Sequence, residues 1–218
     1  MKVDISKLHL ELLDESRQQL LSILLPFSKG YVLGGGTALS LQIAHRVSFE
    51  VAFFSQKPIS RNVVDTLSKK LVIKEVMVHS EDELTFLDSH NIKCTFLYYY
   101  FPNAYSVLEF ETGLDMFSVQ DIAVKKAYTI GRRGVYRDYF DLYTILKNSY
   151  ISLEEIIASA ERVYQGVFNA KLFLEQLVYF KDLPDTDITF ATKDTSVTPN
   201  IVQEYLESEV KNYLKASL

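Results

Sequence analysis

The sequence predicts an α/β (α+β) fold in which a mixed sheet with its helices is followed by a helical second half. Three observations predict it. A short apolar strand runs through three glycines into a helix, several later segments alternate with period two, and from residue 118 onward the apolar residues recur with helical period. We therefore expect an α/β core over residues 1–115 and a helical region over 116–218 that packs on it.

The first elements surround a glycine turn. Leucines near helical spacing predict a helix over residues 6–26, which Pro26 ends. Residues 31–33 are a brief apolar strand. This strand runs into Gly34-Gly35-Gly36 and then into a helix, an arrangement that points the amides of the helix N-terminus at an anion.

The next segment, residues 48–54, alternates as a strand and places positions 50 and 52 on one face. Further elements are expected in this order: a helix over 61–70 and strands around 73–79, 83–87 and 92–99. Because these strands are short and follow one another directly, part of the sheet is expected to be antiparallel.

The second half is predicted to be helical. Ile122, Lys126 and Ile130 fall near one face of its first helix, so we expect Lys126 to face inward. Further helices are expected at residues 137–147, 152–163, 170–180 and 201–214, with a turn-rich linker over 181–199.

Composition narrows the classes of function. The formal charge is -5, from 23 Lys and Arg against 28 Asp and Glu, which argues against a general nucleic-acid binder. The four histidines show no ligand spacing, so no zinc site is predicted, and Cys94 is expected to be a buried, inert thiol. The longest apolar stretch, residues 20–27, is far shorter than the ~20 residues of a membrane span. With no signal peptide visible, we expect a cytoplasmic protein without a membrane partner.

The glycine turn is the strongest chemical signal. After it and its helix, a strand presents positions 50 and 52 on one face. In nucleotidyl transfer such a strand carries two carboxylates, so that divalent metals bridge the triphosphate and activate the attacking group. A tight turn that packs a strand against a helix needs the same glycines, and this alternative stays open.

Two blocks of sequence carry a resemblance. The first reads Leu33-Gly-Gly-Gly-Thr-Ala-Leu39, then His45-Arg46-Val-Ser48 and Phe49-Glu-Val-Ala-Phe-Phe54. The second reads Asp121-Ile-Ala-Val-Lys-Lys126-Ala, then Arg133-Gly134 and Arg137-Asp138-Tyr-Phe-Asp141-Leu-Tyr143. Together they resemble the nucleotidyltransferase-like AbiEii/AbiGii toxin family, in which the strand reads Asp, an apolar residue, then Asp.

The resemblance implies a polymerase-beta-like minimal nucleotidyltransferase fold and metal-dependent transfer from a nucleoside triphosphate. It also implies a bacterial toxin in a toxin–antitoxin or phage-defence system, with an RNA or protein acceptor, a cognate antitoxin, and Mg²⁺ bound with the nucleotide. By position it implies these roles: phosphate binding by Gly35, Gly36 and Thr37, metal binding by Glu50, triphosphate contact by Lys126 with Arg133, and completion of the cleft by Asp138 and Asp141.

Simpler roles stay open for the residues of the second block. Lys126 also fits the surface of an amphipathic helix, and Arg133 fits a helix C-terminus. Asp138 fits a helix N-terminal charge, which is stabilising by itself.

The sequence departs from the family at its metal-binding strand. Glu50 is one methylene longer than Asp, and the second position is Ala52, whose methyl group cannot bind Mg²⁺. Thr95 stands where a third carboxylate is expected. The chain is therefore either a weak transferase or a degenerate relative that binds a nucleotide or a partner protein. A different phosphotransferase is a weaker alternative, since the Gly-Lys-Ser/Thr motif of the common phosphate loop is absent.

Overall fold

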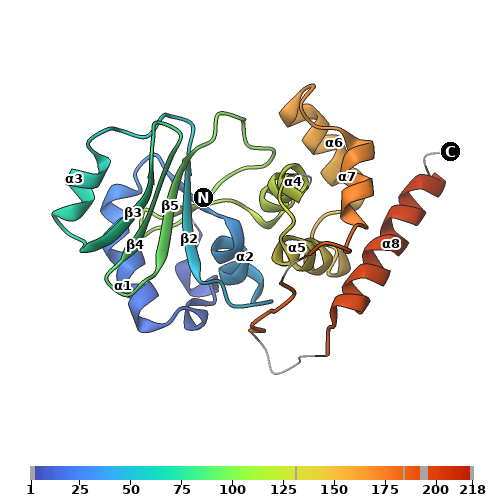
Figure 1. The fold of residues 1–218 in the computed structure, drawn as a ribbon, viewed down its shortest axis with the longest axis horizontal. Coiled ribbons are helices and arrows are strands. Elements are labelled where there is room, and N and C mark those ends of the chain that lie inside the picture. The colour runs from blue at the N-terminus through green and yellow to red at the C-terminus, as the bar shows by residue number, and fades with distance from the viewer. Residues whose placement is uncertain (1–2, 131, 184, 192–195, 217–218) are drawn as a thin grey trace. The chain divides into compact units, whose positions relative to one another are not determined.

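The computed structural model describes residues 3–130, 132–183, 185–191 and 196–216. Within these residues the chain has a seven-stranded mixed sheet and eight α-helices, which confirms the predicted α/β class (Figure 1). The chain divides into two compact units. Residues 1–102 and 106–118 form the sheet unit, and residues 103–105 and 119–218 form the helical unit.

The sheet has the strand order β3-β4-β5-β2-β1-β7-β6. Its strands are β1 (Val32–Gly34), β2 (Glu50–Ser55), β3 (Ile73–His79), β4 (Glu83–Asp88), β5 (Lys93–Tyr98), β6 (Leu108–Glu109) and β7 (Asp115–Met116). The consecutive strands β3, β4 and β5 pair antiparallel, as predicted, whereas β2 pairs parallel with β5 and β1 pairs parallel with β7. The two-residue strands β6 and β7 are too short to leave a periodic signal, and the sequence did not predict them.

Period-two alternation buries one face of the central strands. Val51 and Phe53 of β2 are fully buried, and the Phe53 ring stacks on Phe96 of β5 with ring centroids 5.3 Å apart. Cys94 lies on the same buried face, and burial raises the pKa of its thiol, so the prediction of a buried cysteine is confirmed. Glu50 and Ala52 consequently lie on the opposite face.

Helices of the sheet unit are α1 (Glu15–Leu24), α2 (Gly35–Ile43) and α3 (Val63–Ser68). The predicted helix over residues 6–26 was wrong in its first part. Asp14 caps α1 by accepting a hydrogen bond from the Arg17 amide, so the helix begins at Glu15. Two 3-10 turns precede it, and His9 donates from its amide to the Leu41 carbonyl instead of continuing a helix.

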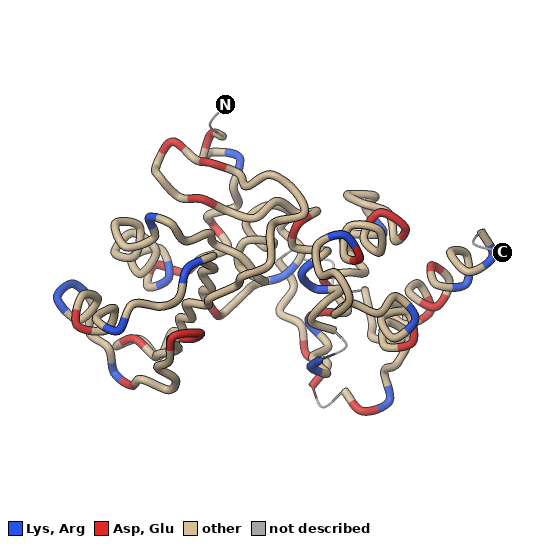
Figure 2. Tube along the Cα trace, turned by 90° about the horizontal axis from the view of Figure 1, so that it is seen from above, with Lys and Arg blue, Asp and Glu red and all other residues tan. Residues whose placement is uncertain are grey.

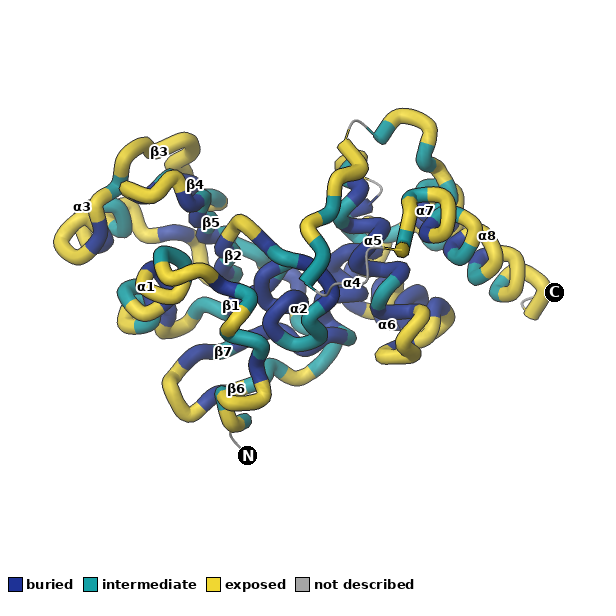
Figure 3. Tube along the Cα trace, turned by 90° about the horizontal axis from the view of Figure 1, so that it is seen from below, coloured by how far each residue is buried: buried dark blue, intermediate teal, exposed yellow. Residues whose placement is uncertain are grey.

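The helical unit contains α4 (Val119–Ile130), α5 (Tyr136–Lys147), α6 (Leu153–Tyr164), α7 (Ala170–Leu177) and α8 (Pro199–Ala216). Helix α4 packs against α5, α6 and α7. Helix α8 packs against the same three helices. Figure 3 shows α4 and α5 as mostly buried and β3 as mostly exposed. Of the predicted linker over 181–199, Pro184 and residues 192–195 lie outside the described residues.

The division into an α/β core over residues 1–115 and a helical region over 116–218 that packs on it stays a prediction. In the described part of the chain, no helix is both long enough and apolar enough to cross a bilayer.

Candidate nucleotide site

Local geometry requires the first two glycines of the turn. Strand β1 ends at Gly34, where a Cβ atom would lie 2.6 Å from the Phe54 ring and 2.8 Å from the Phe117 ring. Gly35 begins α2 with φ +64°, in the left-handed region that favours glycine. A Cβ atom would fit at Gly35, with Ala52 Cβ 3.8 Å away, so it is the backbone conformation that demands glycine there.

A buried arginine requires the third glycine. A Cβ atom on Gly36 would lie 2.5 Å from Nη2 of Arg46 and 3.1 Å from Oγ of Ser48. Arg46 is 3% exposed. Packing therefore accounts for glycine at Gly34 and Gly36, and backbone conformation accounts for it at Gly35. The first turn of α2 nevertheless provides amides without an intrahelical partner, which is the feature that binds anions.

Thr37 ties the turn to the neighbouring strand. Its hydroxyl donates a hydrogen bond to the backbone carbonyl of Glu50, and the residue is buried. Gly34 lies opposite Ala52 in the antiparallel β1–β2 ladder. Glu50 and Ala52 therefore lie beside the glycine turn, and they share the strand face that the alternation of residues 48–54 predicted.

Glu50 faces a cation. Its Oε2 atom lies 3.5 Å from Nζ of Lys93, its in-register neighbour on β5. The side chains of Glu50 and Lys93 are 46% and 39% exposed, so the pair is solvated. Ala52 lies opposite Thr95, whose hydroxyl oxygen is 3.0 Å from that of Thr85 on β4.

These residues do not fit a two-metal centre. Mg²⁺ demands near-octahedral oxygen ligation and uses one or two protein carboxylates together with substrate phosphates. Strand β2 offers one carboxylate, Glu50, which already faces Lys93, and a methyl group at Ala52. Within the described ranges, no group of three or more His, Cys, Asp or Glu residues is placed to hold a metal ion.

The other predicted residues form an ion-pair group in the helical unit, which we call the Lys126 cluster. Nζ of Lys126 lies 2.8 Å from Oδ1 of Asp138 and 2.5 Å from Oδ2 of Asp141. Nε of Arg133 lies 2.9 Å from Oδ2 of Asp138. The side chains of Lys126, Asp138 and Asp141 are buried, whereas that of Arg133 is 58% exposed.

Charge pairing lowers the pKa of one carboxyl group of the Lys126 cluster, that of Asp138. Burial by itself would raise the pKa of Asp138, but the positive charges of Lys126 and Arg133 outweigh burial and lower it. Lys125 is the residue directly before Lys126 on α4. Burial lowers its pKa, and its ion pair with Asp121 at 2.9 Å opposes that shift.

The eight predicted site residues thus form two groups, one in each unit. Gly35, Gly36, Thr37 and Glu50 lie together at the glycine turn. The remaining four are the Lys126 cluster. Lys126 faces inward together with the buried residues Ile122 and Ile130, which confirms the orientation predicted from their spacing.

Sequence reasoning missed two cations at the glycine turn. Arg46 lies within a quoted motif, but its approach to Gly36 depends on how the chain returns from α2 to β2. Lys93 lies beside Glu50 because β5 is the parallel neighbour of β2, a pairing that crosses two intervening strands in sequence. Periodicity along the chain does not predict which distant strands pair, so it could not place Lys93 beside Glu50.

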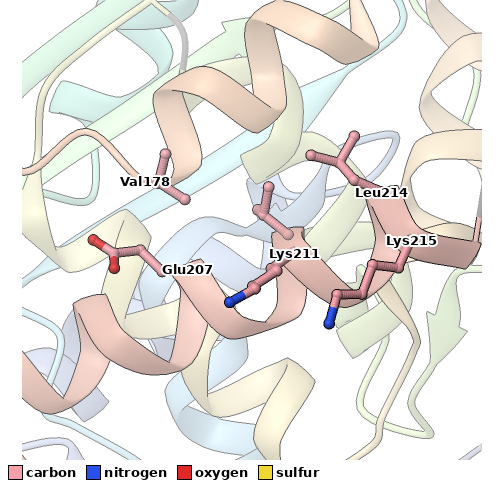
Figure 4. A pocket seen from close by; sticks show the side chains of 6 residues that line it. Val178, Glu207, Lys211, Leu214 and Lys215 are labelled. Atoms are coloured by element: carbon pink, nitrogen blue, oxygen red, sulfur yellow. The ribbon is translucent and has the colours of Figure 1, made fainter.

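A groove on the helical unit contains no predicted site residue. It has a volume of about 400 Å³ and lies between the end of α7 and the last turns of α8 (Figure 4). Its lining consists of Val178, Glu207, Val210, Lys211, Leu214 and Lys215. The lining combines one acidic residue, Glu207, with two basic residues, Lys211 and Lys215, so the groove has mixed charge rather than a basic face. Figure 2 shows acidic and basic positions across the helical unit.

We compared the chain with solved structures and known sequences to identify its fold. A protein from H. pylori assigned as a nucleotidyltransferase superposes with a TM-score of 0.56 at 16% identity, covering 94% of this chain and 99% of the other. The chain has a nucleotidyltransferase-like fold. No protein-family model matches it. In sequence, it is 28% identical over 192 residues to the uncharacterized protein aq_aa25 of Aquifex aeolicus, covering 85% of this chain and 88% of that protein.

Two further structures show weaker similarity. The polyadenylate synthase of Megavirus has a TM-score of 0.45 and 17% identity, with 64% of this chain and 33% of that chain covered. The nucleotidyltransferase toxin MenT4 of Mycobacterium tuberculosis has a TM-score of 0.40 and 14% identity, with 92% and 91% covered.

Proposed function

We propose that this chain binds a nucleoside triphosphate at the glycine turn, with the phosphates on the backbone amides of Gly35, Gly36 and Thr37. The observation that carries the proposal is the junction of β1 and α2 beside Glu50, in a chain with a nucleotidyltransferase-like fold. Helix N-termini favour anions because their amides and dipole both point at the ligand. A triphosphate is expected to bind more tightly than a monophosphate because it meets more of these groups.

We further propose the biological setting that the sequence resemblance implies. The chain acts as a toxin of the AbiEii/AbiGii kind in the bacterial cytoplasm, in a toxin–antitoxin or phage-defence system, with a cognate antitoxin as its partner. An RNA or a protein is the proposed acceptor of the nucleotidyl group.

Alanine at position 52 limits catalysis at this site. A second carboxylate there would share divalent metals with Glu50 and offset the charge that develops on the transferring group. Loss of such an electrostatic contribution is often worth ~3 kcal/mol, on the order of a hundredfold in rate. Mg²⁺ would enter with the triphosphate, with Glu50 as its protein ligand, but the residues present do not organise a two-metal reaction.

Ala52 specifically favours a second function, in which the chain binds a nucleotide and no longer transfers a nucleotidyl group. The two functions predict different results for a restored site. Ala52→Asp, alone and with Glu50→Asp, is assayed for transfer of labelled nucleotide to cellular RNA and protein. If the site is built for transfer, the restored carboxylates should raise the rate of Mg²⁺-dependent transfer at least tenfold above that of the unmodified chain. If the restored pair transfers no more than the unmodified chain, the non-enzymatic function is preferred.

The roles of Lys126 and Arg133 as triphosphate contacts, and of Asp138 and Asp141 in the cleft, stay proposals. Arg133 is the more accessible cation, because Lys126 already contacts two buried carboxylates. We therefore expect Arg133→Gln to weaken triphosphate binding without unfolding the protein. Equal affinity of Arg133→Gln and the unmodified chain for a triphosphate would remove Arg133 from the site.

A further inference from the structure

We propose that Lys93 supplies the positive charge that a metal ion would bring to the glycine turn, so that this chain binds a nucleoside triphosphate without a divalent cation. The inference rests on the proposed function, since it concerns the same site. It assigns a binding role to a residue that the sequence motifs do not include.

The net charge of the β2–β5 pair beside the turn favours the approach of a polyanion. A strand with two carboxylates and no metal is doubly negative and repels a triphosphate until cations load. Here Ala52 is neutral, and the single negative charge of Glu50 faces the ammonium of Lys93 at 3.5 Å. The β2–β5 pair therefore presents no net negative charge where Glu50 lies beside Lys93. A polyanion can approach it before any metal binds.

The residues around Ala52 offer few ligands for a metal ion. Thr95 lies opposite Ala52, and its hydroxyl forms a hydrogen bond with Thr85. Thr85 in turn donates to Oε1 of Glu83 at 2.6 Å. The hydroxyls of Thr95 and Thr85 thus occupy the positions beside Ala52, and the Glu83 carboxylate beyond them accepts a hydrogen bond from Thr85. One carboxylate beside a lysine is a poor Mg²⁺ site.

The ion pair of Lys93 with Glu50 is exposed to solvent. Exposed ion pairs contribute little to stability, because water screens the charges and both long side chains lose freedom. Nζ of Lys93 can therefore move from Glu50 to a phosphate oxygen at small cost. Thr37 anchors the turn to Glu50, and β5 lies one strand spacing from β2, about 5 Å, which a four-carbon side chain spans.

The experiment measures equilibrium binding of ATP, GTP, CTP and UTP to the full chain, once in EDTA and once in excess Mg²⁺. We expect at least one triphosphate to bind with affinities within about threefold in the two conditions. Lys93→Gln keeps the side-chain length and removes the charge. It should lower the affinity in EDTA about tenfold, the usual effect of losing one charge-assisted hydrogen bond.

Two controls make the result specific. Lys93→Arg keeps the charge and should bind like the unmodified chain in EDTA. Lys70→Gln removes an exposed lysine that follows α3 in the same unit and should leave affinity unchanged. Because Glu50 loses its partner in Lys93→Gln, added Mg²⁺ should restore part of the affinity of that variant.

Each outcome decides one claim. Binding that requires Mg²⁺ in the unmodified chain, or an unaltered affinity of Lys93→Gln in EDTA, overturns the role of Lys93 and leaves the proposed function standing. Absence of binding for all four triphosphates in both conditions overturns the proposed function itself, and the role of Lys93 with it.

Discussion

The two groups of charged residues use the same chemistry in opposite environments. Glu50 and Lys93 form an exposed pair on neighbouring strands of the sheet unit, 3.5 Å apart. Lys126 lies in a buried group with two aspartates, at 2.8 and 2.5 Å. A solvated pair is easily broken and can exchange its partner for a ligand, whereas a buried pair is needed for folding because each charge depends on the other.

This difference bears on how motif residues are interpreted. Lys126 lies in the sequence block that resembles a triphosphate contact, yet its ammonium already has two carboxylate partners. Lys93 lies in no recognised motif, yet it is accessible and lies beside Glu50, whose backbone carbonyl contacts the turn. Variants that separate stability from binding therefore test the comparison.

Removal of the Lys126 charge should have the largest effect. Lys126→Met leaves Asp138 and Asp141 buried without their shared cation, and breaking a buried pair in this way costs about 3–5 kcal/mol. The free energy of unfolding, measured by denaturant titration, should fall by that amount. A loss below about 1 kcal/mol, within the range of an exposed pair, would show that the cluster is not a folding element.

Crowding of the glycine turn should have the next largest effect. In Gly36→Ala the new Cβ would meet Nη2 of Arg46 at 2.5 Å, so the buried guanidinium must shift, at a cost of about 1–3 kcal/mol. Triphosphate affinity should fall with it. The matched control is Gly30→Ala, where the Cβ would meet open space and the positive φ alone costs about 1 kcal/mol. Gly30→Ala should leave triphosphate affinity unchanged, and equal loss of affinity in both variants would contradict a local effect.

Acid should weaken the Lys126 cluster through Asp138. Its pKa is lowered in the folded protein relative to the unfolded value of about 3.9, so Asp138 contributes stability above that value. This contribution is lost as the pH falls through the folded pKa. The free energy of unfolding of Asp138→Asn should therefore depend less on pH below roughly pH 4 than that of the unmodified chain. Parallel curves for the two proteins would exclude this role of Asp138.

The smallest effect on stability is expected at the exposed pair. Glu50→Gln and Lys93→Gln should each change the free energy of unfolding by less than about 1 kcal/mol, because water screens both charges. Chemical denaturation of both variants measures this. A loss comparable to that of Lys126→Met would mean that the pair is structural, and the contrast between the two groups would disappear.

Most of the fold could be predicted from local pattern. The turn at Gly34–Gly36, the alternation that places Glu50 beside Ala52, and the strands β3, β4 and β5 all follow from spacing along the chain. Helix capping sets where α1 begins, which the spacing of the leucines alone does not show. The leucines of residues 6–26 continue with helical period through Asp14, but the side chain of Asp14 begins a new helix there.

The site could be predicted only where its residues are close in sequence. Thr37 and Glu50 are joined across one helix, so the prediction of their proximity needed only the order of elements. Lys93 reaches Glu50 through the pairing of β2 with β5, and Asp141 reaches Lys126 through the packing of α5 on α4. These long-range contacts arise from tertiary packing, which sequence periodicity does not encode.

The most direct test of nucleotide binding at the glycine turn is the position of the amide signals in ¹⁵N-labelled protein titrated with ATP. We predict that the largest chemical-shift changes occur at the amides of Gly35, Gly36 and Thr37, with smaller changes for AMP at equal concentration. Changes confined to the groove of α8, or no changes at any concentration that the protein tolerates, would contradict a phosphate site at this turn.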